Sequence, residues 1–149
     1  MKREWRERIV RYTPFILWTG VVLGMSTGGA SMSRTSRIVR PILEFLFPTA
    51  SEADLQFYHG IVRKCAHFSE YAILALLAYR AFIGSSNRFL AGRTAAASFA
   101  AALAVAVTDE TYQSFEASRT GSMLDVGIDM TGAAAALLVL MLVCRVRKN

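Results

Sequence analysis

The sequence lacks the short motifs by which most soluble enzymes and nucleotide-binding proteins are recognised. Its two cysteines and two histidines do not have the spacing of zinc ligands, which excludes the common structural zinc domains. No glycine-rich loop precedes a lysine and no G-x-G-x-x-G run occurs, which excludes the usual phosphate-cradling and dinucleotide-binding folds. Any chemistry must therefore come from residues that the fold brings together.

Charged residues are scarce in four long stretches, residues 14–30, 66–84, 94–108 and 126–144. Hydrophobic residues make up 54% of the 149 residues, and they collect in these stretches, with most charges in the gaps between them. As helices that rise about 1.5 Å per residue, the stretches cross most of a hydrocarbon core of about 30 Å. The sequence therefore predicts an all-α, polytopic membrane protein with four transmembrane helices. We expect a single membrane domain over residues 1–149, with a motif-bearing core at about 63–132.

Two other interpretations of these stretches stay open. A soluble four-helix bundle would need a core that buries helices apolar on every side, and 149 residues do not provide one. The first stretch follows five basic residues and ends in Gly28, Gly29 and Ala30, as a cleaved signal peptide does. The spacing of Gly20, Gly24 and Gly28 suits instead a helix that packs closely against a neighbouring backbone.

Basic residues are distributed unequally between the two sides of the predicted membrane. The side that holds both termini and residues 80–93 carries eleven of the seventeen basic residues and two acidic ones, whereas the other side carries six basic and nine acidic residues. The positive-inside rule then places the protein in the cell membrane with both termini in the cytoplasm. The net charge of +6 is thus explained by topology, without a nucleic-acid partner. Cys65 and Cys144 fall on opposite sides, so we expect no disulfide between them.

A short helix in the plane of the membrane interface is predicted within residues 31–60, between the first two transmembrane helices. Ile38, Ile42, Phe45 and Leu46 share one face of such a helix, and charged residues lie on the others. Pro41 would bend it or mark its first turn. An ordinary loop with an apolar contact to the bundle is the alternative.

Polar residues gather at the outer ends of the second, third and fourth predicted transmembrane helices. They are Lys64, His67, Glu70 and Tyr71 on the second helix, Asp109, Glu110, Gln113 and Glu116 on the third, Arg119 in the connection, and Asp125 and Asp129 on the fourth. Each charge facing lipid costs roughly 2.5 to 3.5 kcal/mol, so these side chains must turn inward, pair or reach water. The spacing therefore predicts a polar pocket that opens outward. A structural ion-pair network that locks three helices together is the alternative.

Two segments resemble the motif blocks of the VanZ-like family of small bacterial membrane proteins. Residues 63–71, RKCAHFSEY, are similar to its K-x-x-H-F-x-E-Y pattern, and residues 109–132 are similar to its second block. The matching positions are Lys64, His67, Phe68, Glu70, Tyr71, Asp109, Glu110, Gln113, Phe115, Arg119, Asp125 and Gly132. Asp129 departs from the family pattern, which usually has Asn there. The family is named for an accessory protein of a glycopeptide-resistance cluster that lowers susceptibility to teicoplanin, so the resemblance implies a role at the cell envelope.

Two classes of function fit these residues. In the first, the outward pocket binds or modifies the head group of an anionic lipid or cell-wall precursor. Lys64 and Arg119 would then hold phosphate oxygens, and His67, Glu70 and Asp109 are the catalytic candidates. No cofactor is evident from the sequence, although the carboxylates suit a divalent cation. In the second class, the protein is a noncatalytic membrane accessory whose polar cluster holds the helices together. An ion pathway is disfavoured because almost nothing polar continues inward from the cluster.

Overall fold

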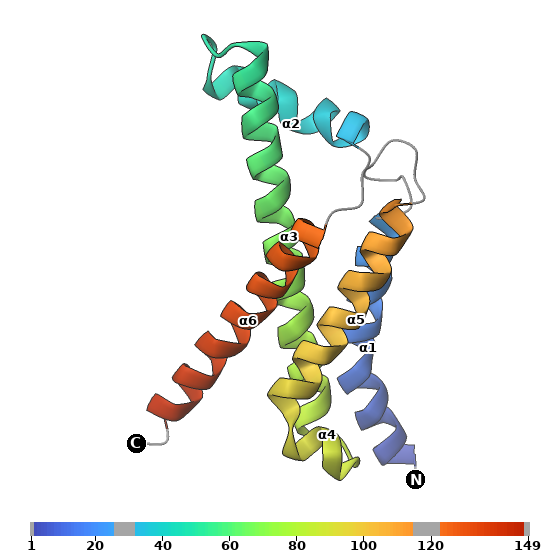
Figure 1. The fold of residues 1–149 in the computed structure, drawn as a ribbon. Helices are drawn as coiled ribbons and strands as arrows, with labels where there is room; N and C mark the ends of the chain where they lie inside the picture. Colours follow the sequence, from blue (N-terminus) through green and yellow to red (C-terminus); the bar gives the residue numbers. More distant parts are fainter. Residues whose placement is uncertain (1, 26–31, 115–122, 148–149) are drawn as a thin grey trace.

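The structure, a computed structural model, describes residues 2–25, 32–114 and 123–147 and consists of helices there (Figure 1). The elements in chain order are α1 (Lys2–Gly24), α2 (Met32–Leu46), α3 (Glu52–Ile83), α4 (Arg88–Gly92), α5 (Thr94–Ser114) and α6 (Met123–Val146). The expected all-α class is confirmed. The longest helix, α3, contacts each of the other five, and it packs most extensively against α6.

Helix α3 begins 14 residues earlier than the apolar stretch predicts, because a capping box starts it at Ser51. The Ser51 side chain accepts a hydrogen bond from the backbone N–H of Asp54, and the Asp54 carboxylate accepts one from the backbone N–H of Ser51. Arg40 of α2 donates hydrogen bonds to Glu44 and to Glu52 in the first turn of α3. Helix α2 lies across the beginning of α3 (Figure 1), and these contacts hold it there.

Small residues let α3, α5 and α6 pack closely. The core contains Ala75 of α3, Ala102 and Ala106 of α5, and Ala133 of α6, all with no exposed surface. Leu74 and Tyr71 of α3 fill the space between these alanines, and a second cluster around Phe82 lies toward the far end of α3. Helix α1 joins this bundle through Trp18, whose indole N–H donates a 3.0 Å hydrogen bond to the backbone carbonyl of Glu70.

Helix α1 differs from the sequence prediction in its extent, and α2 is the short helix expected within residues 31–60. Helix α1 begins at Lys2, so Pro14 lies inside it, and α2 contains Pro41 well beyond its first turn. The close approach of a neighbouring backbone expected at Gly20 and Gly24 is not found among the described residues, where an added Cβ at either position would meet nothing within 4 Å. Gly28 lies outside the described residues.

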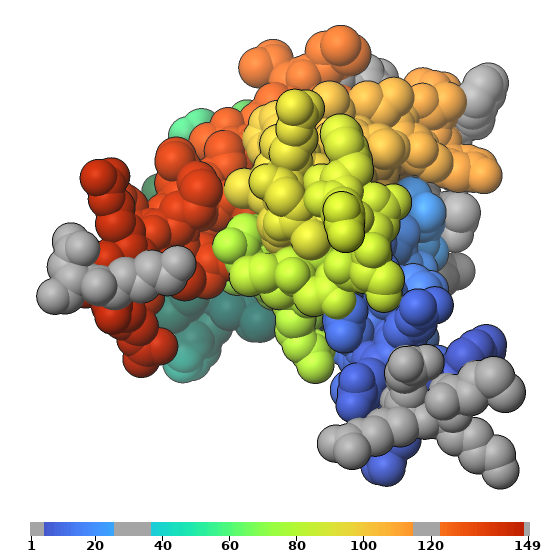
Figure 2. Space-filling model, turned by 90° about the horizontal axis from the view of Figure 1, so that it is seen from below, coloured from blue at the N-terminus to red at the C-terminus, as the bar shows by residue number. Residues whose placement is uncertain are grey.

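The two ends of the bundle are different. The first residues of α1, the last residues of α6 and the short helix α4 lie at one end, and α2 lies at the other (Figure 1). Seen from the end with the termini, α6 and α1 lie on opposite sides of the region where α3 ends and α4 follows (Figure 2). Helix α6 separates from the bundle toward its C-terminus, and Leu137 is its last buried residue.

Much of the outer surface is apolar. On α6, Leu138, Val139 and Leu142 are more than half exposed, and similar side chains lie exposed along α1 and α3. Of the helices that the structure describes, α6 alone is long and apolar enough by composition to cross a membrane.

Candidate functional site

The site begins where α3 and α6 cross. An added Cβ at Gly132 of α6 would lie 2.1 Å from the backbone carbonyl oxygen of Phe68, so only glycine allows this approach. One turn before Gly132, Asp129 is 1% exposed, and its Oδ1 lies 3.2 Å from Nδ1 of His67. The crossing of the two helices therefore places an imidazole against a buried carboxylate.

Asp109 of α5 supplies a second buried carboxylate to the site. Its Oδ2 accepts a 3.3 Å hydrogen bond from the hydroxyl of Tyr71 and a 3.0 Å hydrogen bond from the side-chain amide of Gln113. The amide oxygen of Gln113 in turn accepts a 3.2 Å hydrogen bond from the guanidinium of Arg63. This chain of contacts connects the half-buried Arg63 with a carboxylate that is 2% exposed.

His67, Asp109 and Asp129 together have the geometry of a metal site. One ligand atom from each residue can be chosen so that all three atoms lie within 4.8 Å of one another. Two carboxylate oxygens of this group, Asp109 Oδ1 and Asp129 Oδ2, are buried and have no hydrogen-bond partner. Unpartnered buried carboxylate oxygens are costly in a low-dielectric interior. A cation held among the three residues would compensate both oxygens.

The other residues predicted for the pocket lie around this group at different depths. Glu110 is buried on α5, Asp125 is partly buried one turn before Asp129, and Glu70 is partly buried on α3. Lys64 is exposed, and no ion pair joins it to another described residue. Arg119 and Glu116 lie outside the residues that the structure describes.

Two residues of α3 that the sequence reasoning did not select also belong to this region. Arg63, four residues before His67, is the α3 residue that places a cationic group at the site, where we expected Lys64. His59, a further turn back, is 7% exposed, and its Nε2 has no hydrogen-bond partner. The spacing of His59, Arg63, His67 and Tyr71 at four-residue intervals puts them along one side of α3, and this spacing was the available signal.

The arrangement can act in two ways. One nitrogen and two oxygen ligands form a mixed set of the kind that binds zinc or manganese, and carboxylates alone suit magnesium or calcium. Arg63 supplies a cationic group beside the three, suited to an anionic ligand. The same hydrogen bonds also connect α3 with α5 and α6, so they contribute to holding the helices together.

A comparison with models of protein families finds a match over residues 12–144 to a family described as VanZ/LLP1. The matched region contains all three residues of the metal-site geometry. No curated protein and no solved structure matches the chain.

Proposed function

Since the chain belongs to the VanZ/LLP1 family of membrane proteins, we propose that it is a cell-envelope protein whose His67–Asp109–Asp129 group holds a divalent cation. The cation binds the phosphate-bearing head group of an anionic lipid or cell-wall precursor. The observation that carries this proposal is the pair of buried, unpartnered carboxylate oxygens beside His67.

The membrane arrangement in this proposal has four crossings, through α1, α3, α5 and α6, with both termini in the cytoplasm. The charge asymmetry of the sequence supports this orientation, and so does the position of both termini and α4 at one end of the bundle. Helix α3, with 32 residues, is roughly 48 Å long, which exceeds a hydrocarbon core of about 30 Å. If Ile83 lies at the inner boundary of the hydrocarbon core, Arg63 lies near its outer boundary. His67 then lies about one helical turn deeper in the membrane than Arg63.

This depth suits recognition of a head group rather than transport. A phosphate at the outer boundary can reach a cation at His67 from the water side, and Arg63 can hold a second oxygen of the same ligand by its planar fork of donors. Below the site, the core of the bundle is formed mainly by leucine, alanine and aromatic side chains, and the buried Ser98 hydroxyl of α5 donates a hydrogen bond to the backbone carbonyl of Thr94. Among the described residues, no charged side chain is buried in this part of the core, which disfavours an ion pathway.

Metal binding is tested first, with the purified full-length chain in detergent and Mn²⁺ titrated by electron paramagnetic resonance. We expect one ion per chain, and a loss of affinity of at least tenfold in His67→Gln and in Asp109→Asn. Glu44→Gln, which removes an exposed acid far from the site, is the matched control. Equal Mn²⁺ binding by all four proteins would refute the metal site.

Ligand binding is tested separately, by native mass spectrometry with lipids of defined head group. We expect an anionic phospholipid to bind in a manner that EDTA reverses in the wild type and that is absent from His67→Gln. In cells, His67→Gln, Asp109→Asn and Arg119→Ala should each abolish the envelope phenotype, with teicoplanin susceptibility as one readout, while the proteins still insert into the membrane. A wild-type phenotype in all three would refute a functional pocket.

The alternative function is that of a noncatalytic accessory protein in which the cluster is a helix lock. The hydrogen bonds from His67 to Asp129 and from Tyr71 to Asp109 favour it, because they connect three helices directly. Asp129→Asn discriminates the two functions, since an amide still accepts the hydrogen bond from His67 but is a poor metal ligand. A lock keeps its phenotype in this variant, whereas a metal-dependent site loses it.

The topology has its own test in the two cysteines, which are both exposed. In intact cells, a membrane-impermeant maleimide should label a variant that retains only Cys65 and should not label one that retains only Cys144. Labelling of Cys144 in intact cells would place the C-terminus outside and refute the orientation.

A further inference from the structure

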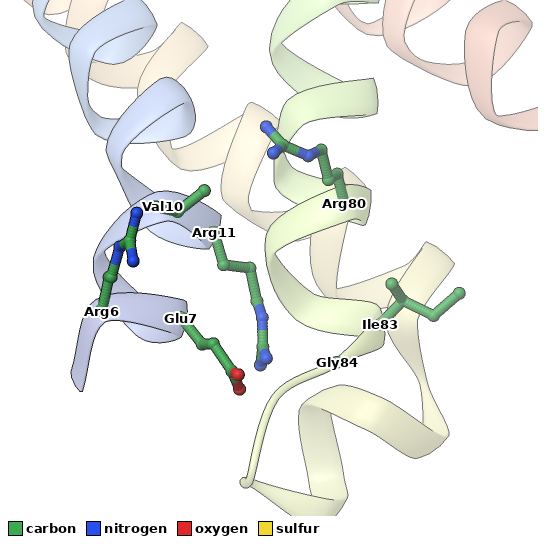
Figure 3. A pocket seen from close by; sticks show the side chains of 7 residues that line it. All are labelled: Arg6, Glu7, Val10, Arg11, Arg80, Ile83 and Gly84. Atoms are coloured by element: carbon green, nitrogen blue, oxygen red, sulfur yellow. The ribbon is translucent and has the colours of Figure 1, made fainter. Parts of the chain in front are cut away.

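A cavity of about 540 Å³ lies at the opposite end of the bundle from α2, between the first turns of α1 and the last turn of α3. It is lined by Arg6, Glu7, Val10 and Arg11 of α1 and by Arg80, Ile83 and Gly84 at the end of α3. Figure 3 shows the Arg11 and Glu7 side chains extending from α1 toward Gly84, while Arg80 extends from α3 toward α1. The cavity is thus a basic pocket, separate from the site at His67.

We propose that this basic pocket binds an anionic phosphate group, carried by a phospholipid of the surrounding membrane. Three guanidinium groups and one carboxylate line it, so its lining has a net positive charge. Among the described residues, no hydrogen bond or ion pair is found for Arg6, Arg11 or Arg80. Arginine binds phosphate oxygens through two parallel N–H donors, and basic pockets between transmembrane helices at a membrane surface bind lipid head groups.

The walls of the pocket are fixed by contacts between α1 and the chain that follows α3. The hydroxyl of Tyr12 donates a 3.0 Å hydrogen bond to the side chain of Ser85, and Arg8 donates one of 3.3 Å to Ser86. Gly84 leaves room for Arg11, because an added Cβ would lie 3.1 to 3.3 Å from three atoms of the guanidinium. The pocket is therefore held open between two helices and does not depend on the ligand for its shape.

An apolar surface beside the pocket favours a lipid over free phosphate. Val10 lines the pocket and is 56% exposed, and Leu17 and Val21 continue the same face of α1 at 64% and 46% exposure. From Val10 to Val21 this stripe is roughly 16 Å long, which is enough for most of an acyl chain. Ile83 adds an exposed apolar side chain on the α3 side. A bound phospholipid would place its phosphate among the arginines and its chains along α1.

The test compares two double variants of the full-length chain by native mass spectrometry in detergent. The first, Arg11→Gln with Arg80→Gln, removes two charges from the pocket. The second, Arg145→Gln with Arg147→Gln, removes two exposed charges at the same end but outside the pocket. Phosphatidylglycerol and phosphatidylcholine with identical chains are titrated in the presence of EDTA, which removes metal-dependent binding at His67.

We expect the wild type and the Arg145/Arg147 variant to bind phosphatidylglycerol more tightly than phosphatidylcholine. The Arg11/Arg80 variant should bind phosphatidylglycerol about thirtyfold more weakly than the wild type does. Inorganic phosphate in excess should not displace the lipid, and displacement by phosphate alone would identify a soluble ligand of the same chemistry. Retention of phosphatidylglycerol by the pocket variant would overturn the proposal, as would equal binding of the two lipids by the wild type. If the double variant fails to fold, the single variants Arg6→Gln and Arg80→Gln replace it, since both positions are exposed. Each is expected to bind phosphatidylglycerol about fivefold more weakly than the wild type does.

Discussion

Gly132→Ala offers the most direct test of how the helix crossing builds the site. The added Cβ would lie 2.1 Å from the carbonyl oxygen, 2.9 Å from the carbonyl carbon and 3.0 Å from the Cα of Phe68. An ordinary carbon–oxygen contact is about 3.3 Å, so α6 must move away from α3 by roughly 1.2 Å. Because these atoms belong to the backbone, no side chain can turn aside to relieve the contact.

The displacement has two expected consequences. Overpacking of this kind destabilises a protein by about 1 to 3 kcal/mol, which lowers the midpoint of thermal unfolding. The 3.2 Å contact between His67 and Asp129 also lengthens beyond hydrogen-bonding distance, so we expect Mn²⁺ affinity to fall by at least about tenfold. Both quantities are measured on the purified chain, by scanning fluorimetry and by electron paramagnetic resonance.

Gly127→Ala is the matched control, because it adds the same methyl group to the same helix at a position with nothing within 4 Å. It should retain the wild-type metal affinity and be at least as stable as the wild type. If Gly132→Ala behaves in the same way as Gly127→Ala, the crossing does not set the geometry of the site and the reasoning is refuted.

Three other predictions concern single contacts. Tyr71→Phe removes the hydroxyl that donates to Asp109, so it should cost about 1.5 to 3 kcal/mol of unfolding free energy, and an unchanged unfolding midpoint would contradict this. Arg63→Lys keeps the charge but removes the planar fork, so it should weaken EDTA-sensitive lipid binding while leaving Mn²⁺ affinity unchanged, as parallel titrations would show. Hydrogen bonds from the Ser51 hydroxyl and backbone lower the pKa of the Asp54 carboxyl. The stabilisation that the Asp54 carboxylate gives to the start of α3 should therefore be complete above about pH 4 and disappear as pH falls through the lowered pKa. NMR titration of Asp54 would measure this pKa, and in Ser51→Ala the lowering should be lost.

The sequence predicted the parts of the fold that depend on hydropathy. Helices α5 and α6 lie close to the predicted stretches because their ends are marked by a change from apolar to charged residues. The start of α3 was missed because residues 52–60, assigned to the outer segment, are polar enough to resemble a loop. Their helix depends on the Ser51 cap and on packing against α2. The short helix α4 was also missed, since its five residues carry no apolar period.

The composition of the site was more predictable than its contacts. Spacing of three and four residues grouped His67 and Tyr71 on one side of α3, and in the structure each of them contacts a buried carboxylate. The choice of Lys64 rather than Arg63 depends on the rotation of α3 about its axis, because adjacent residues differ by about 100°. The crossing at Gly132 fixes that rotation. A helical wheel of one segment does not contain this information.

The crossing at Gly132 also divides α6 into a short segment and a long segment that move together as one rigid helix. In one direction from the crossing, Asp129 is roughly 4.5 Å away along the helix axis. In the other direction, the long segment of α6 reaches Val146 roughly 21 Å away. Beyond Leu137 the long segment is mostly exposed, and in the proposed membrane arrangement its tilt would follow the thickness of the surrounding lipid. A sideways shift of about 5 Å at its tip corresponds to about 1 Å at Asp129. In that arrangement, the thickness of the membrane would influence the spacing of His67, Asp109 and Asp129.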